Sequence, residues 1–316
     1  MKITILDKIA LGEDTPLKIL EDFGEVTVFP TTAPEERVEH IGDSEIIVLN
    51  KVKITEEVMA SCKSLKLICV FATGYDNIDI PAAKKYGIAV CNVPGYSTDS
   101  VVLFTLATVL SLVTHLGEYN EYVRNGAYSA SSSANKITPV FHELRGKTWG
   151  IVGFGNIGKA VAKVAQTLGA EIIVNKRTSI DGYHCVDIDT LCKTSDIITV
   201  HCPLNNETKG IINKDRLAAM KKSVILVNEA RGAVLDENDV ANAILEKQIA
   251  AFGCDVYSAE PFDTSHPYNK IKNLDNVILT PHAAWGAYEA RERCIQIIAK
   301  NIDSFLNRGT LNRVDI

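Results

Sequence analysis

Three polar side chains follow three consecutive apolar runs in the second half of the chain: Arg231, Glu260 and His282. An imidazole exchanges protons near neutral pH, and a nearby carboxylate favours its imidazolium form. A guanidinium can hold a carboxylate with two parallel bonds and polarise an adjacent carbonyl. Each residue alone has an ordinary explanation, as a surface ion pair, a solvated loop charge or a loop histidine. Together, at the ends of parallel strands, they would converge at one sheet edge as an acid–base site.

A glycine-rich loop precedes these residues. It comprises Gly153, Phe154, Gly155, Asn156, Ile157 and Gly158, after the apolar run Trp149–Val152 and before the amphipathic stretch Lys159–Leu168. In a strand–turn–helix context the first glycine makes the tight turn, the second admits a pyrophosphate and the third lets the helix pack closely. The helix N-terminus then faces the phosphates. The pattern predicts dinucleotide binding, with a methyltransferase or a structural glycine turn as alternatives.

The next apolar run, Glu171–Val174, lacks the acidic residue that usually holds the adenosine ribose. It is followed by Asn175, Lys176, Arg177 and Thr178, and these groups could hold a 2′-phosphate. The sequence therefore favours NADP over NAD, although two solvated cations at a strand end are the alternative.

Short apolar runs alternate with helical patterns along the chain, which is typical of parallel α/β sheets. Five predicted strands precede residue 97, at Ile3–Leu6, Val26–Phe29, Ile46–Leu49, Leu67–Val70 and Ile88–Cys91. Six follow it, at Thr148–Val152, Glu171–Val174, Ile197–Val200, Val224–Asn228, Ala251–Asp255 and Val277–Thr280. The prediction is an α/β protein with two doubly wound parallel-sheet domains. A Rossmann nucleotide domain, residues 98–285, is inserted into a flavodoxin-like substrate domain, residues 1–97 plus 286–316.

A single long helix is expected from Ser97 to Asn125, and a last helix from Tyr288 to Leu306. The first of these and the loop after it are too hydrophobic for a solvent face, so a homodimer is expected. Burial of this helix between the two domains is the alternative.

The bulk composition excludes several classes of protein. The 316 residues carry a net charge of −6, which argues against nucleic acid as a main partner. Neither a signal peptide nor a membrane span is expected. The eight cysteines are scattered without a C-x-x-C pair, so no metal site is expected and a reducing cytoplasm fits best.

Several stretches together resemble the D-isomer-specific 2-hydroxyacid dehydrogenases over nearly the whole chain. They are His142–Trp149 leading into the glycine loop, His201–Leu204 with Thr208, Asn228–Gly232, Asp255–Pro261 and Thr280–His282. The resemblance implies Arg231, Glu260 and His282 as the catalytic set. It also implies that Asp255 holds the nicotinamide carboxamide. His201, Cys202, Pro203 and Thr208 would line the cofactor cleft, with the backbone of Glu229, Ala230 and Arg231 beside the nicotinamide ribose.

In the first domain, Phe71–Asp79 resembles the substrate loop of this family, and backbone N–H groups near Thr73 and Gly74 would bind the substrate carboxylate. Asn50–Thr55 and Pro281–Trp285 resemble segments of glycerate dehydrogenases, also called hydroxypyruvate reductases. Lys51 would then reach toward the carboxylate, unless it is only a solvated lysine. Tyr96 and Trp285 would shape the pocket.

The expected activity is therefore reversible reduction of a short 2-oxoacid, such as hydroxypyruvate or glyoxylate, to the D-2-hydroxyacid. Larger or branched 2-oxoacids and phosphoglycerate are alternative substrates. A non-catalytic protein that senses NAD(P) is a further alternative, because such proteins can retain the same three residues. The sequence departs from the family at Lys176, where NAD-linked members carry an acid, and at Leu103, where relatives often carry a polar residue.

Overall fold

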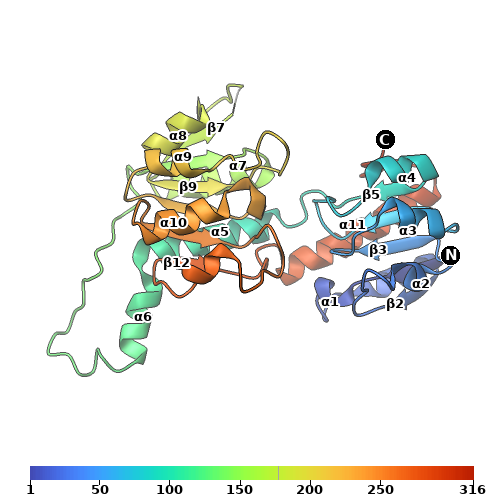
Figure 1. Ribbon diagram of the computed structural model, residues 1–316, viewed down its shortest axis with the longest axis horizontal. Helices are drawn as coiled ribbons and strands as arrows, with labels where there is room; N and C mark the ends of the chain where they lie inside the picture. The colour runs from blue at the N-terminus through green and yellow to red at the C-terminus, as the bar shows by residue number, and fades with distance from the viewer. Residues whose placement is uncertain (177) are drawn as a thin grey trace. The chain divides into compact units, whose positions relative to one another are not determined.

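The computed structural model describes residues 1–176 and 178–316, and they form two compact units. Unit 1 comprises Met1–Ser97 and Gly286–Ile316, and unit 2 comprises Thr98–Trp285. The chain therefore leaves unit 1 and returns to it after completing unit 2 (Figure 1). Each unit is built on a parallel sheet of its own, which confirms the predicted α/β class.

Unit 1 has a five-stranded parallel sheet in the order β2-β1-β3-β4-β5, the flavodoxin-like order. The strands are β1 (Lys2–Ile5), β2 (Glu25–Val28), β3 (Ile46–Leu49), β4 (Leu67–Val70) and β5 (Ala89–Cys91). β3 and β4 are buried along their whole length, as expected for apolar runs covered on both faces. The helical segments are α1 (Lys8–Leu11), η1 (Leu17–Phe23), α2 (Arg37–Ile41), α3 (Glu56–Ser61), α4 (Ile80–Tyr86) and α11 (Tyr288–Leu306).

Unit 2 has a seven-stranded parallel sheet in the order β12-β11-β10-β9-β6-β7-β8. Counted from β6, this is the 3-2-1-4-5-6 order of a dinucleotide-binding sheet with one extra edge strand. The strands are β6 (Thr148–Val152), β7 (Glu171–Asn175), β8 (His184–Val186), β9 (Ile197–Val200), β10 (Ile225–Asn228), β11 (Ala251–Cys254) and β12 (Val277–Leu279). β8 is missing from the sequence prediction, because this three-residue edge strand has no apolar run and only intermediate or exposed residues.

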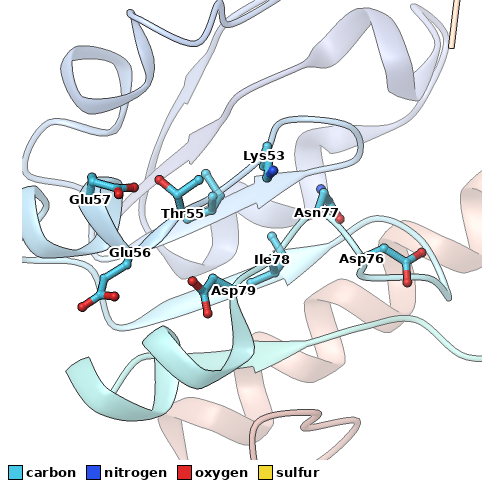
Figure 2. Close-up of a pocket in the computed structure, with 9 residues that line it drawn as sticks. Lys53, Thr55, Glu56, Glu57, Asp76, Asn77, Ile78 and Asp79 are labelled. Carbon is cyan, nitrogen blue, oxygen red and sulfur yellow. The ribbon is translucent and has the colours of Figure 1, made fainter. Parts of the chain in front are cut away.

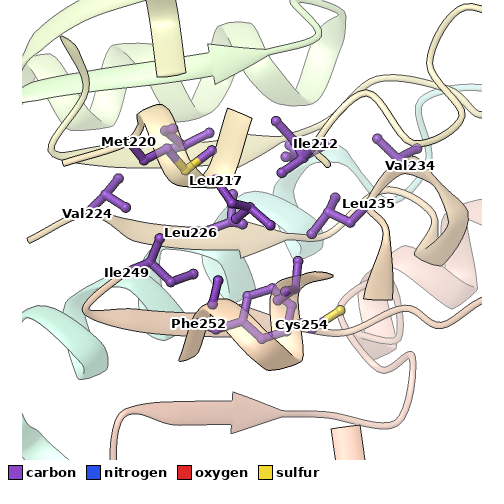
Figure 3. Packing of buried hydrophobic residues seen from close by; sticks show 14 of the residues in the cluster. Ile212, Leu217, Met220, Val224, Leu226, Val234, Leu235, Ile249, Phe252 and Cys254 are labelled. Atoms are coloured by element: carbon purple, nitrogen blue, oxygen red, sulfur yellow. The ribbon is translucent and has the colours of Figure 1, made fainter. Parts of the chain in front are cut away.

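Helices cover both faces of the second sheet. One face packs on α5 (Thr98–Thr114) and α7 (Asn156–Thr167), around Trp149 and Val227. The other face packs on α8 (Ile188–Thr194), α9 (Lys214–Ala219) and α10 (Glu237–Leu245). Figure 3 shows this second core, where Leu217 and Leu226 lie beside Phe252. Two short 3-10 helices, η2 (Gly232–Val234) and η3 (Pro267–Lys270), complete the unit.

The single helix predicted from Ser97 to Asn125 is wrong. The chain forms α5 and then α6 (Leu116–Arg124), bent by 66° at His115. His115 has the left-handed φ of 52°, and its ring lies 2.8 Å from the Glu118 carboxylate one turn into α6. A helix cannot continue through a left-handed residue, so the apolar pattern carries on while the backbone turns. No single described helix is long and apolar enough to cross a membrane, although α5 and α6 together pass by length and composition.

Candidate functional site

The three predicted catalytic residues follow three neighbouring strands of unit 2. Arg231 comes after β10, Glu260 after β11 and His282 after β12, and these strands are adjacent and parallel. Their carboxyl ends therefore meet at one edge of the sheet, where ligands of open α/β sheets bind.

Glu260 and His282 form a hydrogen-bonded pair. The Nδ1 atom of His282 lies 2.7 Å from Oε2 of Glu260, and each side chain is 24% exposed. The backbone N–H of Tyr257 donates to the other carboxylate oxygen at 3.0 Å, so Glu260 is fixed at both oxygens. This arrangement orients the imidazole ring of His282.

The segment that carries His282 is held by Asp255. One oxygen of this buried carboxylate accepts from the Thr280 hydroxyl at 2.6 Å and the Ala283 amide at 2.8 Å, and the other accepts from the Ala284 amide at 2.9 Å. The Tyr257 hydroxyl also donates to the Thr280 carbonyl at 2.8 Å. His282 has the left-handed φ of 54°, an uncommon conformation that such bonds can maintain. Any contact of Asp255 with a cofactor would add to these bonds.

Arg231 lies on a tight turn after β10. The side chain of the buried Asn228 accepts from the Ala230 amide at 3.1 Å and donates to the Arg231 carbonyl at 3.0 Å. A Cβ on Gly232 would lie 2.0 Å from the Tyr257 carbonyl carbon, so the Arg231 turn presses directly on the segment before Glu260. Sequence reasoning gave no role to Asn228 or Tyr257. The sequence did contain a signal for both, because Asn228 lies in the motif that carries Arg231 and Tyr257 lies in the motif that carries Glu260.

The glycine loop has the shape required for a phosphate site. A Cβ on Gly153 would meet the Cys202 nitrogen at 2.4 Å, and one on Gly158 would meet the Gly153 carbonyl oxygen at 2.2 Å. Gly155, by contrast, has open space where its side chain would be. Gly155 is the N-cap of α7 and no side chain caps this helix, so its first N–H groups can face an anion. Asn156 and Ile157 are the first two residues of α7, and Phe154 is buried before it.

The strand ends beside this loop carry buried polar groups. Burial lowers the pKa of His201 to about 3, so its imidazole is neutral at pH 7. Burial, and secondarily the charge of Asp255, raises the pKa of Glu229 to about 9. Among the described residues, neither side chain has a hydrogen-bond partner. Burial also raises the pKa of the Cys202 thiol to about 11. The unpaired groups of His201 and Glu229, together with the open space at Gly155, fit a polar dinucleotide.

Two further predicted cofactor residues, Asn175 and Thr208, use their side chains in hydrogen bonds within the protein. The Asn175 amide donates to the Val186 carbonyl at 3.3 Å, which joins β7 to β8. Thr208 organises its own loop, because its hydroxyl donates to the Pro203 carbonyl at 2.6 Å and accepts from the Asn205 amide at 2.8 Å. Lys176 and Thr178 are exposed, and Arg177 lies outside the described residues.

The predicted substrate residues of unit 1 follow β3 and β4. Asp7 accepts backbone N–H bonds from Asn50, Lys51 and Val52, at 2.9, 2.6 and 3.3 Å. Its burial raises its pKa, and these bonds oppose that shift. The Thr73 hydroxyl donates to the Val93 carbonyl at 2.9 Å.

The sequence analysis overlooked Asp7, an acidic residue two positions after the end of β1. Gly74 follows Thr73 in the same loop, and the Tyr96 carbonyl accepts from Arg293 Nε at 3.0 Å. Trp285 is the last residue of unit 2.

A cavity of about 350 Å³ in unit 1 lies next to these loops and is lined by residues 53–57 and 76–79 (Figure 2). Most of its polar groups are occupied or acidic. Glu56 pairs with Lys85 at 2.6 Å, Asp79 caps α4, and the Asn77 amide binds the Asn50 and Val52 carbonyls. The carboxylates that line this cavity would repel an anionic substrate such as a 2-oxoacid, so the cavity is not part of the candidate site.

Comparisons with known proteins identify the family and agree with the fold. Residues 106–284 match the model of the family described as D-isomer specific 2-hydroxyacid dehydrogenase, NAD binding domain. Hydroxypyruvate reductase of Blautia hydrogenotrophica is 37% identical over the full length of both chains. An acyclic imino acid reductase in complex with NADPH and D-Arg superposes with a TM-score of 0.89 at 30% identity, covering 99% of this chain and all of the other.

D-Lactate dehydrogenase from Aquifex aeolicus, complexed with NAD and lactic acid, superposes with a TM-score of 0.87 at 26% identity, covering 100% of this chain and 99% of the other. The chain therefore belongs to the D-isomer-specific 2-hydroxyacid dehydrogenase family of oxidoreductases, as its motifs predict.

Proposed function

We propose that this protein reversibly reduces a short 2-oxoacid, of the hydroxypyruvate or glyoxylate class, to the D-2-hydroxyacid with a nicotinamide cofactor. The observation that carries the proposal is the 2.7 Å bond between His282 and Glu260, at the sheet edge where the turn of Arg231 also ends. The full-length similarity to a hydroxypyruvate reductase supports the substrate class.

The three residues divide the chemistry between them. Glu260 binds His282 at Nδ1, so proton exchange with the substrate oxygen occurs at Nε2. In reduction His282 donates this proton, and in oxidation it accepts it. Arg231 holds the substrate carboxylate and polarises the carbonyl. A bound nicotinamide supplies or accepts the hydride at the carbonyl carbon.

Unit 1 would contribute the remaining substrate contacts. Backbone N–H groups at Thr73 and Gly74 and the Lys51 ammonium would bind the carboxylate. Hydrogen bonds that hold both loops in place support this proposal. The Lys51 amide donates to the Asp7 carboxylate, and the Thr73 hydroxyl donates to the Val93 carbonyl. Tyr96 and Trp285 would set the size of the pocket.

We favour NADP over NAD as the cofactor. Lys176 stands where the ribose-binding acid of a dinucleotide sheet is expected, directly after β7, and it is exposed. A cation at this position would attract the 2′-phosphate of NADP. The ribose 2′-hydroxyl of NAD would lack the carboxylate that usually accepts its hydrogen bond. The glycine loop, the backbone of Ala230, and the His201–Thr208 segment would hold the rest of the cofactor.

Turnover with a panel of substrates tests the proposal. We expect glyoxylate or hydroxypyruvate with NADPH to give the highest kcat/KM, above NADH and above pyruvate, branched 2-oxoacids and phosphohydroxypyruvate. A larger 2-oxoacid as the best substrate would replace the proposed substrate class. Absence of turnover with every pair would favour a non-catalytic NAD(P)-sensing protein.

The role of His282 is tested by His282→Asn. Loss of the proton donor should lower kcat by roughly 10²- to 10⁴-fold. Cofactor affinity, measured by protein fluorescence, should stay close to that of the wild type. His184→Asn, at an exposed histidine of β8 in the same unit, is the matched control. Weakened cofactor binding with normal turnover at saturation would refute the assigned role.

We also propose that the protein is a cytoplasmic homodimer. Figure 1 shows α6 and the chain after it standing out from the sheet of unit 2. This arm exposes large apolar side chains, at Leu116, Val123, Ile137, Val140 and Phe141. The arm is internally ordered, because the Tyr119 hydroxyl donates to the Pro139 carbonyl at 2.6 Å. A second copy of the same arm would cover it. The eight free cysteines support a reducing compartment.

A further inference from the structure

Four polar side chains form a row across the carboxyl end of the second sheet. Val200, Asn228, Cys254 and Leu279 are in register across β9, β10, β11 and β12. The residues that directly follow them are His201, Glu229, Asp255 and Thr280, which we name the terminal row. Because side chains alternate along a strand, the row lies on the face of Val227 and Gly253, which α5 covers.

The two halves of the terminal row differ in their bonding. Asp255 and Thr280 bind one another, and Asp255 also accepts from the amides of Ala283 and Ala284, the two residues that directly follow His282. Glu229 is only 8% exposed, and among the described residues its oxygens make no hydrogen bond of normal geometry, although the Thr108 hydroxyl of α5 lies close enough to interact with them. His201 is half-buried, and its two shielded ring nitrogens are likewise unpaired among those residues.

The surroundings of Glu229 oppose a negative charge there. Burial disfavours the charged form of Glu229, and the carboxyl group of Asp255 at the next strand end adds to this effect. On the α5 side, the Thr108 hydroxyl lowers the pKa of Glu229, but by less than burial raises it. The strand end on the other side of Glu229 carries His201, whose ring is neutral. Two neighbouring buried carboxyl groups cannot both ionise cheaply. Asp255 accepts three hydrogen bonds and Glu229 accepts none of normal geometry, so Glu229 is the carboxyl group that keeps its proton.

We propose that Glu229 is a positioning residue that acts as a neutral carboxylic acid. It leaves Asp255 as the one carboxylate of the terminal row, and its ionisation at alkaline pH loosens the hold of Asp255 on the His282 segment. A second buried negative charge forces Asp255 either to move toward solvent or to take up a proton. Either event removes acceptors from Thr280, Ala283 and Ala284. The inference rests on the proposed acid–base role of His282.

The pH dependence of hydroxyacid oxidation tests this idea. In this direction His282 must be neutral, so the acidic limb of kcat reports His282 and the alkaline limb reports Glu229. Glu229→Gln keeps the shape and cannot ionise, and Glu171→Gln, at an exposed carboxylate of β7, is the control. The wild type and the control should lose kcat above about pH 9, whereas the Glu229→Gln limb should move up by about one unit or more. Glu229→Gln should then be about five- to tenfold faster where the wild type has fallen to a tenth.

Infrared spectroscopy gives a second readout that needs no turnover. At pH 8 the wild type and Glu171→Gln should show the C=O stretch of a protonated buried carboxylic acid, and Glu229→Gln should lack it. An unchanged alkaline limb in Glu229→Gln would overturn the positioning role, and absence of the carboxylic acid band from the wild type would overturn the neutral state. If no hydroxyacid is oxidised, or if His282→Asn keeps its kcat, the proposed function fails instead, while the infrared result still decides the state of Glu229.

Discussion

At the scale of single residues, the site depends on how each charge is paired. Glu260 binds His282 directly, and Asp255 binds the segment on which His282 stands. The first contact orients the ring, and the second fixes the backbone segment that carries it. Two carboxylates that both follow β11 thus serve different tasks, because one faces a ring nitrogen and the other faces backbone amides.

The buried Glu229 predicts a pH dependence of stability. Its pKa is about 9 in the folded protein against an ordinary 4.5, so between these values the unfolded chain releases a proton that the folded chain keeps. The free energy of unfolding contributed by this group therefore falls as pH rises from 4.5 to 9, by up to about 1.4 kcal/mol per pH unit. Glu229→Gln should remove this fall and be more stable than the wild type at pH 8 in urea unfolding. Equal pH slopes for the two proteins would contradict the prediction.

At the scale of elements, close backbone approach joins the two loops that carry Arg231 and Glu260. Gly232 begins η2 and lies against the Tyr257–Ser258 peptide, where a Cβ would approach within 2.2 Å of two backbone atoms. Backbone atoms cannot rotate away as a side chain can. The two loops can therefore lie this close together only because residue 232 is a glycine.

Gly232→Ala should push these loops apart. We expect a loss of stability of about 2 kcal/mol from overpacking and a fall in kcat, because both Arg231 and Glu260 are displaced. Gly210→Ala is the control for a glycine substitution in unit 2, since its φ of 61° is strained but a Cβ there meets only open space. Thermal unfolding should show a loss of stability for both variants, whereas kcat should fall only for Gly232→Ala. Wild-type kcat in Gly232→Ala would contradict the packing argument.

At the scale of the whole molecule, the arm formed by α6 and the chain after it predicts the oligomeric state. Ile137 is 79% and Phe141 51% exposed, which is unusual for large apolar side chains on an ordered segment. The double variant Ile137→Ser, Phe141→Ser should shift the protein from dimer to monomer in light scattering. Ile9→Ser, at a 63% exposed isoleucine of α1 in unit 1, should leave the dimer intact. A wild type that is monomeric at micromolar concentration would exclude the dimer.

Much of the architecture is predictable from the sequence because parallel strands buried on both faces are continuous apolar runs. The runs Ile46–Leu49 and Leu67–Val70 coincide with β3 and β4 at both ends. The prediction fails where the periodicity carries no information. His115 breaks the helix with a backbone conformation rather than with a change in polarity, and β8 pairs through its backbone without an apolar run.

The sequence by itself determined the family and the fold class and predicted Arg231, Glu260 and His282 as the catalytic set, because these depend on residue types at short spacings after recognisable strands. Only the tertiary structure decided how those residues are held. The bonds of Asp255 to Ala283 and Ala284 and the terminal row with its unpaired Glu229 join strands that are far apart in the chain. Strand order and burial set such contacts and their pKa shifts, and neither is visible in the spacing of residues along one chain.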